Sequence, residues 1–195
     1  NTVSYVDKTA TKTDWHYSYS VRAVNGSNKS TYNTDGIDFN YMRAPKLKKA
    51  YSYTNGAKIT WSDASDVAEK YYVYRKTSSG WKKIGTTTKK YYTDKTAVSG
   101  KAYTYMVKAV SKNNSGAYNS KGIKVNYLAM PKLGTVTFDS KNYAKVTWST
   151  VKGASGYKVF RKINSADEWK EIATVKGGTK VSYLDKTAKK SGYTY

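Results

Sequence analysis

The chain has 195 residues and a formal net charge of +22, from 35 lysines and arginines against 13 acidic residues, and it contains no cysteine. This length fits one large domain or two small ones, and the lack of cysteine excludes a disulfide framework and a thiolate zinc site. No stretch of about 18 apolar residues occurs, so the sequence predicts no membrane insertion.

The first predicted element, residues 3–10, belongs to an internal repeat. Its sequence VSYVDKTA returns as KYYTDKTA at residues 90–97 and as VSYLDKTA at residues 181–188. Ala10 and Ala97 are 87 positions apart, and Ala97 and Ala188 are 91 positions apart. This spacing indicates that one structural unit of about ninety residues recurs along the chain.

The segments that follow recur in the same phase and have the composition of β-strands. They alternate in period two, are rich in Tyr, Val, Ile, Thr and Trp, and are separated by Gly, Asn, Ser and Asp. The matched segments are residues 17–24 with 103–110, 58–62 with 145–149, and 71–76 with 157–162. About seven short strands per unit cannot bury their apolar faces in one open sheet, so we predict two antiparallel sheets packed as a β-sandwich.

The strand at residues 103–110 shows the expected division into two faces. Tyr105, Val107 and Ala109 fall on one face, and Met106 and Lys108 fall on the other. The alternation predicts that the first face is buried and that the second faces solvent.

Three motifs of the repeat resemble those of fibronectin type III domains of bacterial surface proteins. They are an early tryptophan, a Tyr-x-Val-x-Arg strand at 71–75 and 157–161, and Gly-x-x-Tyr-x-Tyr-x-Val-x-Ala at 100–109. The resemblance covers nearly the whole chain and implies an all-β fold of tandem fibronectin type III-like (immunoglobulin-like) antiparallel β-sandwiches. It implies that Trp61 and Trp148 are core residues. It also implies tyrosine corners, in which a hydroxyl bonds to nearby backbone, at Tyr17, Tyr103 and Tyr193.

Counted against strands A to G of such a sandwich, the chain holds one whole repeat and two partial ones. Residues 1–43 hold strands E to G of a first repeat, residues 44–129 a complete repeat, and residues 130–195 strands A to F of a third. A half sandwich exposes its core face and open strand edges. We therefore expect either a fragment of a longer array or ends that complete each other, by head-to-tail self-association or by curling back.

The joints between repeats are short, with the sequences YMRAP at residues 41–45 and YLAMP at residues 127–131. Both contain proline and lack glycine, which predicts stiffness. Met42, Leu128 and Met130 are expected to pack between neighbouring sandwiches and to favour an extended rod.

Candidate catalytic and metal-binding residues have simpler structural interpretations. The single histidine, His16, lies in a turn and has no cysteine to partner it in nucleophilic catalysis. Asp63, Asp66 and Glu69 are close in sequence, but the matching loop at 150–156 has no acid, so a solvated loop is favoured over a calcium site. We predict no enzyme activity, no cofactor and no metal site.

Three aspartates recur at the end of the same strand, namely Asp7, Asp94 and Asp185. Each is followed by Lys-Thr-Ala, where a short carboxylate can accept hydrogen bonds from backbone N–H groups of a turn. We predict that they cap this turn.

The candidate binding face lies on the outer side of the strand at residues 71–76. If Tyr71 faces inward, period-two alternation turns Tyr72 and Tyr74 outward, beside a neighbouring strand. Exposed tyrosines stack on sugars and make rigid apolar contacts with proteins, so the face is a candidate for a host glycan, a glycoprotein or a host protein such as an immunoglobulin. Its residues are Tyr72, Tyr74, Met106 and Lys108.

Structural alternatives apply to these residues as well. Tyrosines on adjacent strands stabilise a sheet without binding a partner. Trp81, a further binding candidate, recurs as Trp169, which favours a half-buried structural role.

The basic residues favour nonspecific attraction to polyanions over specific nucleic-acid binding. Only four of them are arginine, and the lysines are spread along the whole chain. Base readout and bidentate phosphate contacts favour arginine, whereas a dispersed positive charge attracts any polyanion.

These patterns predict a non-catalytic, extracellular stalk or adhesin segment of a Gram-positive bacterial surface protein, on the cell surface or secreted, which spaces or displays a binding face. Two alternatives stay open. One is an accessory module of a secreted carbohydrate-active enzyme, and the other is a host-protein binding module.

Overall fold

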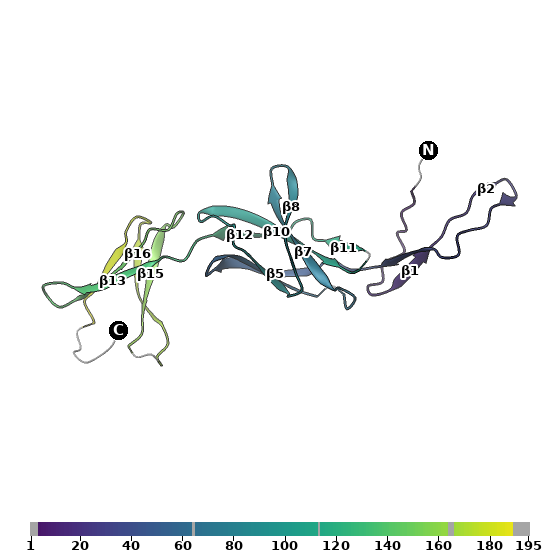
Figure 1. Ribbon diagram of the computed structural model, residues 1–195. Helices are drawn as coiled ribbons and strands as arrows, with labels where there is room; N and C mark the ends of the chain where they lie inside the picture. Colours follow the sequence, from purple (N-terminus) through teal and green to yellow (C-terminus); the bar gives the residue numbers. More distant parts are fainter. Residues whose placement is uncertain (1–3, 64, 113, 164–165, 189–195) are drawn as a thin grey trace. The chain divides into compact units, whose positions relative to one another are not determined.

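The computed structural model describes residues 4–63, 65–112, 114–163 and 166–188 (Figure 1). All regular structure in these ranges is β-strand, which confirms the predicted all-β fold. The described ranges contain no helix that could cross a lipid bilayer. Contacts between Cα atoms divide the chain into two compact units, one of Asn1–Ala50, Lys58–Asp94 and Tyr103–Lys124, the other of Tyr51–Ala57, Lys95–Ala102 and Val125–Tyr195.

The first repeat contains a two-stranded antiparallel sheet. Strand β1 (His16–Tyr19) pairs with β4 (Ile37–Asn40), and the short strands β2 (Val24–Asn25) and β3 (Asn28–Lys29) form a hairpin between them. Apolar side chains of this repeat, such as Val21, are exposed, because no second sheet of the first repeat is present among the described residues to cover them.

The second repeat has two sheets. One has the strand order β5-β6-β9, and the other has the order β11-β10-β7-β8, with β12 also paired to β10. Their bounds are β5 (Lys46–Tyr53), β6 (Gly56–Ser62), β7 (Lys70–Thr77), β8 (Gly80–Thr87), β9 (Tyr91–Asp94), β10 (Lys101–Val110), β11 (Ser115–Tyr118) and β12 (Ile123–Tyr127).

The core of the second repeat lies between these sheets. Ile59 and Trp61 of β6 are buried, as are Val73 of β7 and Tyr105 of β10. The ring of Trp61 meets the ring of Tyr71 edge-on at 5.4 Å between centroids, which joins the two sheets. The predicted inward face of β10 is therefore buried, as its alternation indicates.

The third repeat has the same two kinds of sheet with fewer described strands. Its first sheet has the order β13-β14-β17, and its second is the pair β15-β16. The bounds are β13 (Leu133–Phe138), β14 (Ala144–Trp148), β15 (Gly156–Arg161), β16 (Lys170–Lys176) and β17 (Ser182–Asp185). Trp148 again meets a tyrosine, Tyr157, at 5.3 Å between ring centroids.

Candidate functional site

The outer face of β7 and β10 brings the predicted binding residues together. In the antiparallel register, Tyr72 lies opposite Lys108, and Tyr74 lies opposite Met106. The two tyrosines and the lysine are partly exposed. The sequence pattern therefore placed these four side chains on one patch of sheet.

Met106 differs from the prediction, because it is only 3% exposed. Strand β10 runs in the middle of its sheet, between β7 on one side and β11 and β12 on the other. A side chain at the centre of a wide sheet is flanked by longer neighbours, here including Tyr74, so period-two alternation alone does not expose it. Met106 is consequently not a surface contact of the face.

Lysine ammonium groups cover two of the tyrosine rings on this face. The Nζ of Lys83 on β8 lies 3.3 Å from the ring centroid of Tyr72, and the Nζ of Lys108 lies 4.7 Å from that of Tyr118 on β11. Such cation–π contacts hold a lysine in place. We call Lys83, Tyr72, Tyr74, Lys108 and Tyr118 the lysine–tyrosine face. The sequence predicted exposed tyrosine rings on this face, but two of its rings are in contact with lysine ammonium groups.

Trp81 lies at the edge of the same sheet and is partly exposed. The Nζ of Lys76 is 5.8 Å from its ring centroid, and its ring packs so closely against Gly122 that a Cβ there would lie 3.0 Å from the indole. Its counterpart Trp169 in the third repeat is 64% exposed. Trp81 is thus less exposed than its counterpart in the third repeat.

A buried ion pair recurs at the strand that carries the repeated aspartate. Arg75 donates to Asp94 at 2.8 Å, and Arg161 donates to Asp185 at 2.7 Å. Asp94 is 2% exposed and also accepts a hydrogen bond from the hydroxyl of Tyr105 at 2.9 Å. Burial and this hydrogen bond raise the pKa of Tyr105.

The turn-capping role of the aspartates is seen in the first and third repeats. Asp7 accepts from the backbone N–H of Thr9 at 2.7 Å, and Asp185 accepts from that of Thr187 at 2.9 Å. Burial opposes ionisation of Asp185, but hydrogen bonds from Thr187 and Arg161 outweigh it, so its pKa lies below the ordinary value. Sequence reasoning found the aspartates but missed their arginine partners, although Arg75 and Arg161 recur in phase.

The predicted tyrosine-corner residues have different surroundings. The hydroxyl of Tyr17 accepts a hydrogen bond from the backbone N–H of Lys12 at 3.3 Å. The ring of Tyr103 lies 5.1 Å from the guanidinium carbon of Arg75. Tyr193 lies outside the described residues.

The acidic loop after β6 is engaged in protein contacts. Asp63 forms an ion pair with Lys90 and accepts a hydrogen bond from the hydroxyl of Tyr71, and both contacts hold its pKa below the ordinary value. The described ranges contain no group of three or more His, Cys, Asp or Glu side chains that could hold a metal ion. His16 lies on β1, where Asn40 Oδ1 is 3.0 Å from its Nδ1.

A loop of the first repeat contacts the loop after β6 in the second. Asp14 has a left-handed backbone (φ 67), and its carboxylate accepts hydrogen bonds from the hydroxyl of Ser65 and from the backbone N–H of Asp66, the latter at 3.0 Å. Met42, at the joint, is buried and its carbonyl accepts from Ala117 N–H at 3.1 Å.

The matching loops of the second and third repeats make the same kind of contact. Ser99 Oγ donates to the carbonyl of Lys152 at 2.8 Å, and Gly100 lies so close to Gly153 that a Cβ on Gly153 would collide with the Cα of Gly100. Asp14 and Gly100 occupy the same repeat position, and both have left-handed backbone. This loop contact was not predicted, and Met130, which was expected to pack at the joint, is exposed.

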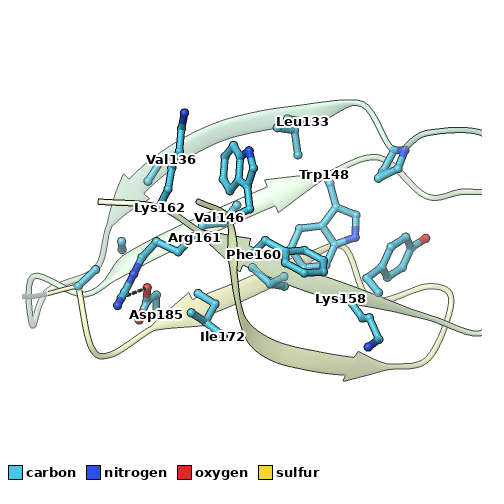
Figure 2. Close-up of a pocket in the computed structure, with 16 residues that line it drawn as sticks. Leu133, Val136, Val146, Trp148, Lys158, Phe160, Arg161, Lys162, Ile172 and Asp185 are labelled. Atoms are coloured by element: carbon cyan, nitrogen blue, oxygen red, sulfur yellow. Dashed lines mark hydrogen bonds and ion pairs between the residues drawn. The ribbon is translucent and has the colours of Figure 1, made fainter. Parts of the chain in front are cut away.

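The third repeat contains an apolar hollow of about 630 Å³ between its two sheets. Figure 2 shows Val146, Trp148 and Phe160 around this space, with the ion pair of Arg161 and Asp185 at one end. In the second repeat the matching space is filled by buried residues of β10. The hollow therefore lies at the position where β10 contributes to the core in the second repeat.

Comparisons with known proteins give matches among solved structures alone. No family model matches the chain, and no curated protein matches it. Matched structures include a Fn3-like protein from Clostridium thermocellum, with 29% identity over 49% of this chain and 96% of that chain and a TM-score of 0.34. The FN1–FN3 domains of chicken CNTN1 match with 16% identity over 88% of this chain and 67% of that chain, with a TM-score of 0.37.

A two-domain fibronectin type III segment of chicken tenascin also matches, with 15% identity over 73% of this chain and 81% of that chain and a TM-score of 0.35. The fold itself is read from this chain's own strands: a sheet of order β5-β6-β9 lies against one of order β11-β10-β7-β8, and the pattern recurs. The chain is an all-β protein of tandem fibronectin type III-like sandwiches.

Proposed function

We propose that this chain is a non-catalytic stalk segment of an extracellular surface protein of a Gram-positive bacterium, in which tandem sandwiches space or display a binding face. The observation that carries the proposal is the recurrent loop contact between successive repeats. Asp14 meets Ser65 and Asp66, and the same repeat position, Gly100, meets Gly153.

A stalk needs each module to hold the next in a fixed orientation, because a freely jointed chain loses reach with every joint. The contact supports this in two chemical forms. One joint is held by hydrogen bonds to a carboxylate, and the other by close backbone packing with the hydrogen bond from Ser99 to Lys152. The absence of cysteine fits the extracellular sandwiches of such bacteria, which fold without disulfides.

The proposal is tested by small-angle scattering from the whole chain. A compact globule of 195 residues has a radius of gyration of about 16 Å. A stalk is expected to give a value well above this, whereas a value near about 16 Å would contradict the proposal.

A matched pair of variants tests whether the joint itself sets the shape. Gly153→Ala places a Cβ against Gly100, so the distribution of distances between the second and third repeats should broaden. Gly177→Ala is the control, because its backbone is also left-handed (φ 100 against 87) but the nearest atom to the added Cβ is the Cγ of Lys180 at 3.7 Å. Equal effects of the two variants would show that backbone strain at any glycine broadens the distance distribution. The contact between Gly100 and Gly153 would then not fix the orientation of the repeats.

A further inference from the structure

The sheet that carries the lysine–tyrosine face has no carboxylate in any of its strands. Strands β7, β8, β10, β11 and β12 contain lysines and one arginine but no aspartate or glutamate. The arginine, Arg75, is bound to Asp94 of the opposite sheet. The outward charge of this sheet is therefore carried by lysines alone.

This charge pattern is not required by the fold, because the third repeat has a glutamate at the place of one of these lysines. In the second repeat, Tyr74 lies opposite Lys83. In the third, Phe160 occupies the place of Tyr74 and lies opposite Glu171. Glu171 forms an ion pair with Lys158 at 2.8 Å, so the matching face is neutralised.

The lysines of the face are held in position before any partner arrives. Contact with the rings of Tyr72 and Tyr118 restricts Lys83 and Lys108, so less side-chain entropy is lost when an anion binds. An ammonium group is a point charge with three donors and suits a phosphate, whereas planar bidentate recognition uses arginine.

The same contacts select against partners that bind by stacking. The ammonium group of Lys83 occupies the ring face of Tyr72 on which a sugar or a nucleic-acid base would otherwise stack. Lys83 and Lys108 lie on strands that flank β7, so two strand spacings, roughly 10 Å, separate their strands. A flexible chain with an anion every few bonds can reach both charges.

We propose that the lysine–tyrosine face binds a linear polyol-phosphate polymer, a chain of phosphodiesters joined by small polyols. The inference rests on the proposed extracellular role and names a partner for the displayed face. Binding is electrostatic, with Lys83 and Lys108 as the main contacts, and it weakens as salt rises.

The test is calorimetric titration of the whole chain with poly(glycerol phosphate), at low and at physiological salt. Lys83→Gln with Lys108→Gln should weaken binding roughly tenfold and reduce the slope of log affinity against log salt by about two. The control, Lys132→Gln with Lys141→Gln, removes the same charge from exposed sites in the third repeat and should change affinity by less than about threefold. Equal losses in both variants, or no binding by the unaltered chain at physiological salt, would overturn the proposal.

A gain-of-function variant guards against an effect of misfolding. Glu171→Lys removes the ion pair of the third repeat and should increase affinity for the same polymer, because it creates a second positive face. Unchanged affinity would count against the face as the binding element.

Duplex DNA serves as a competing phosphodiester in the same titration. Tighter binding of DNA than of poly(glycerol phosphate), with the same dependence on Lys83 and Lys108, would overturn the assignment to polyol phosphates. Neither lysine takes part in the joints between repeats, so an absence of polymer binding would leave the stalk proposal intact. A compact scattering profile in a chain that still binds the polymer would reject only the stalk proposal.

Discussion

Matching positions of the second and third repeats differ in how far their side chains are exposed to solvent. Tyr74 is partly buried, whereas its counterpart Phe160 is 47% exposed. The difference arises because β10 pairs with β7 in the second repeat and flanks Tyr74, whereas in the described part of the third repeat β15 pairs with β16 alone. Local sequence therefore decides which face of the strand a side chain occupies, and the neighbouring strand of the sheet decides whether that side chain is shielded from water.

The largest effect expected from this comparison is on the buried ion pair of the complete sandwich. Asp94→Asn leaves the guanidinium of Arg75 without its counter-charge and should lower the free energy of unfolding by about 3 kcal/mol. The value is at the low end for a buried pair because the side chain of Arg75 is 23% exposed. Urea denaturation followed by tryptophan fluorescence measures it.

The control for this variant is Asp7→Asn, at the same repeat position in the first repeat. Asp7 is partly exposed and bonds to Thr9 and to the hydroxyl of Tyr19. Its replacement should lower the free energy of unfolding much less than the replacement of Asp94. Equal costs at the two positions would show that burial of the pair is unimportant.

A second prediction concerns the open core of the third repeat. We expect that the β1–β4 pair of one molecule, with the residues that follow β1, can complete the third repeat of another, as β10 completes the second. Val107 lies opposite Val73, and the repeat places Val21 and Val159 at these two positions. A chain with Val21→Cys and Val159→Cys should therefore form intermolecular disulfides on mild oxidation, because it has no other cysteine.

The comparison variant is Val21→Cys with Lys158→Cys, which shifts one partner by a single residue and turns it to the opposite face of β15. It should cross-link much more slowly on a non-reducing gel. Comparable ladders from both variants would indicate random collision, and monomers alone would reject head-to-tail completion.

The smallest expected effect is the pH response of the first repeat. Hydrogen bonding to Asn40, assisted by the nearby carboxylate of Asp38, raises the pKa of His16 above 6.5. A raised pKa in the folded state means that charged His16 stabilises the β1–β4 pair below about pH 6.5 and that this contribution is lost as pH rises through the folded-state pKa. NMR titration of the imidazole should show the pKa fall towards 6.5 in Asn40→Ala; an unchanged value would contradict the assignment.

The fold could be predicted from the sequence because the same strand patterns occur in three copies along the chain. Alternation predicted that Tyr72 and Lys108 face the same side of presumed neighbouring strands, and in the structure they lie opposite each other. The burial of Met106 did not, because it depends on how many strands flank β10. The covering of Tyr72 by Lys83 also escaped prediction, because a flexible side chain reaches diagonally across strands to a partner that strand register alone does not identify.

The loop contacts at the joints were beyond sequence reasoning for a different reason. They join residues about fifty positions apart whose chemistry differs between joints, a carboxylate in one and two glycines in the other. The signal was present only as a shared position: Asp14 and Gly100 align in the repeat, and both residue types tolerate left-handed backbone.

The unequal chemistry of the joints would have a mechanical consequence if the proposed stalk is pulled. The Asp14 joint is held partly by hydrogen bonds worth about 1 kcal/mol each, far less than the cooperative stability of a folded domain. Under a slowly rising load such a contact releases before any sandwich unfolds and can form again when the load drops. The array would then yield in small reversible steps and absorb shocks while its modules stay folded.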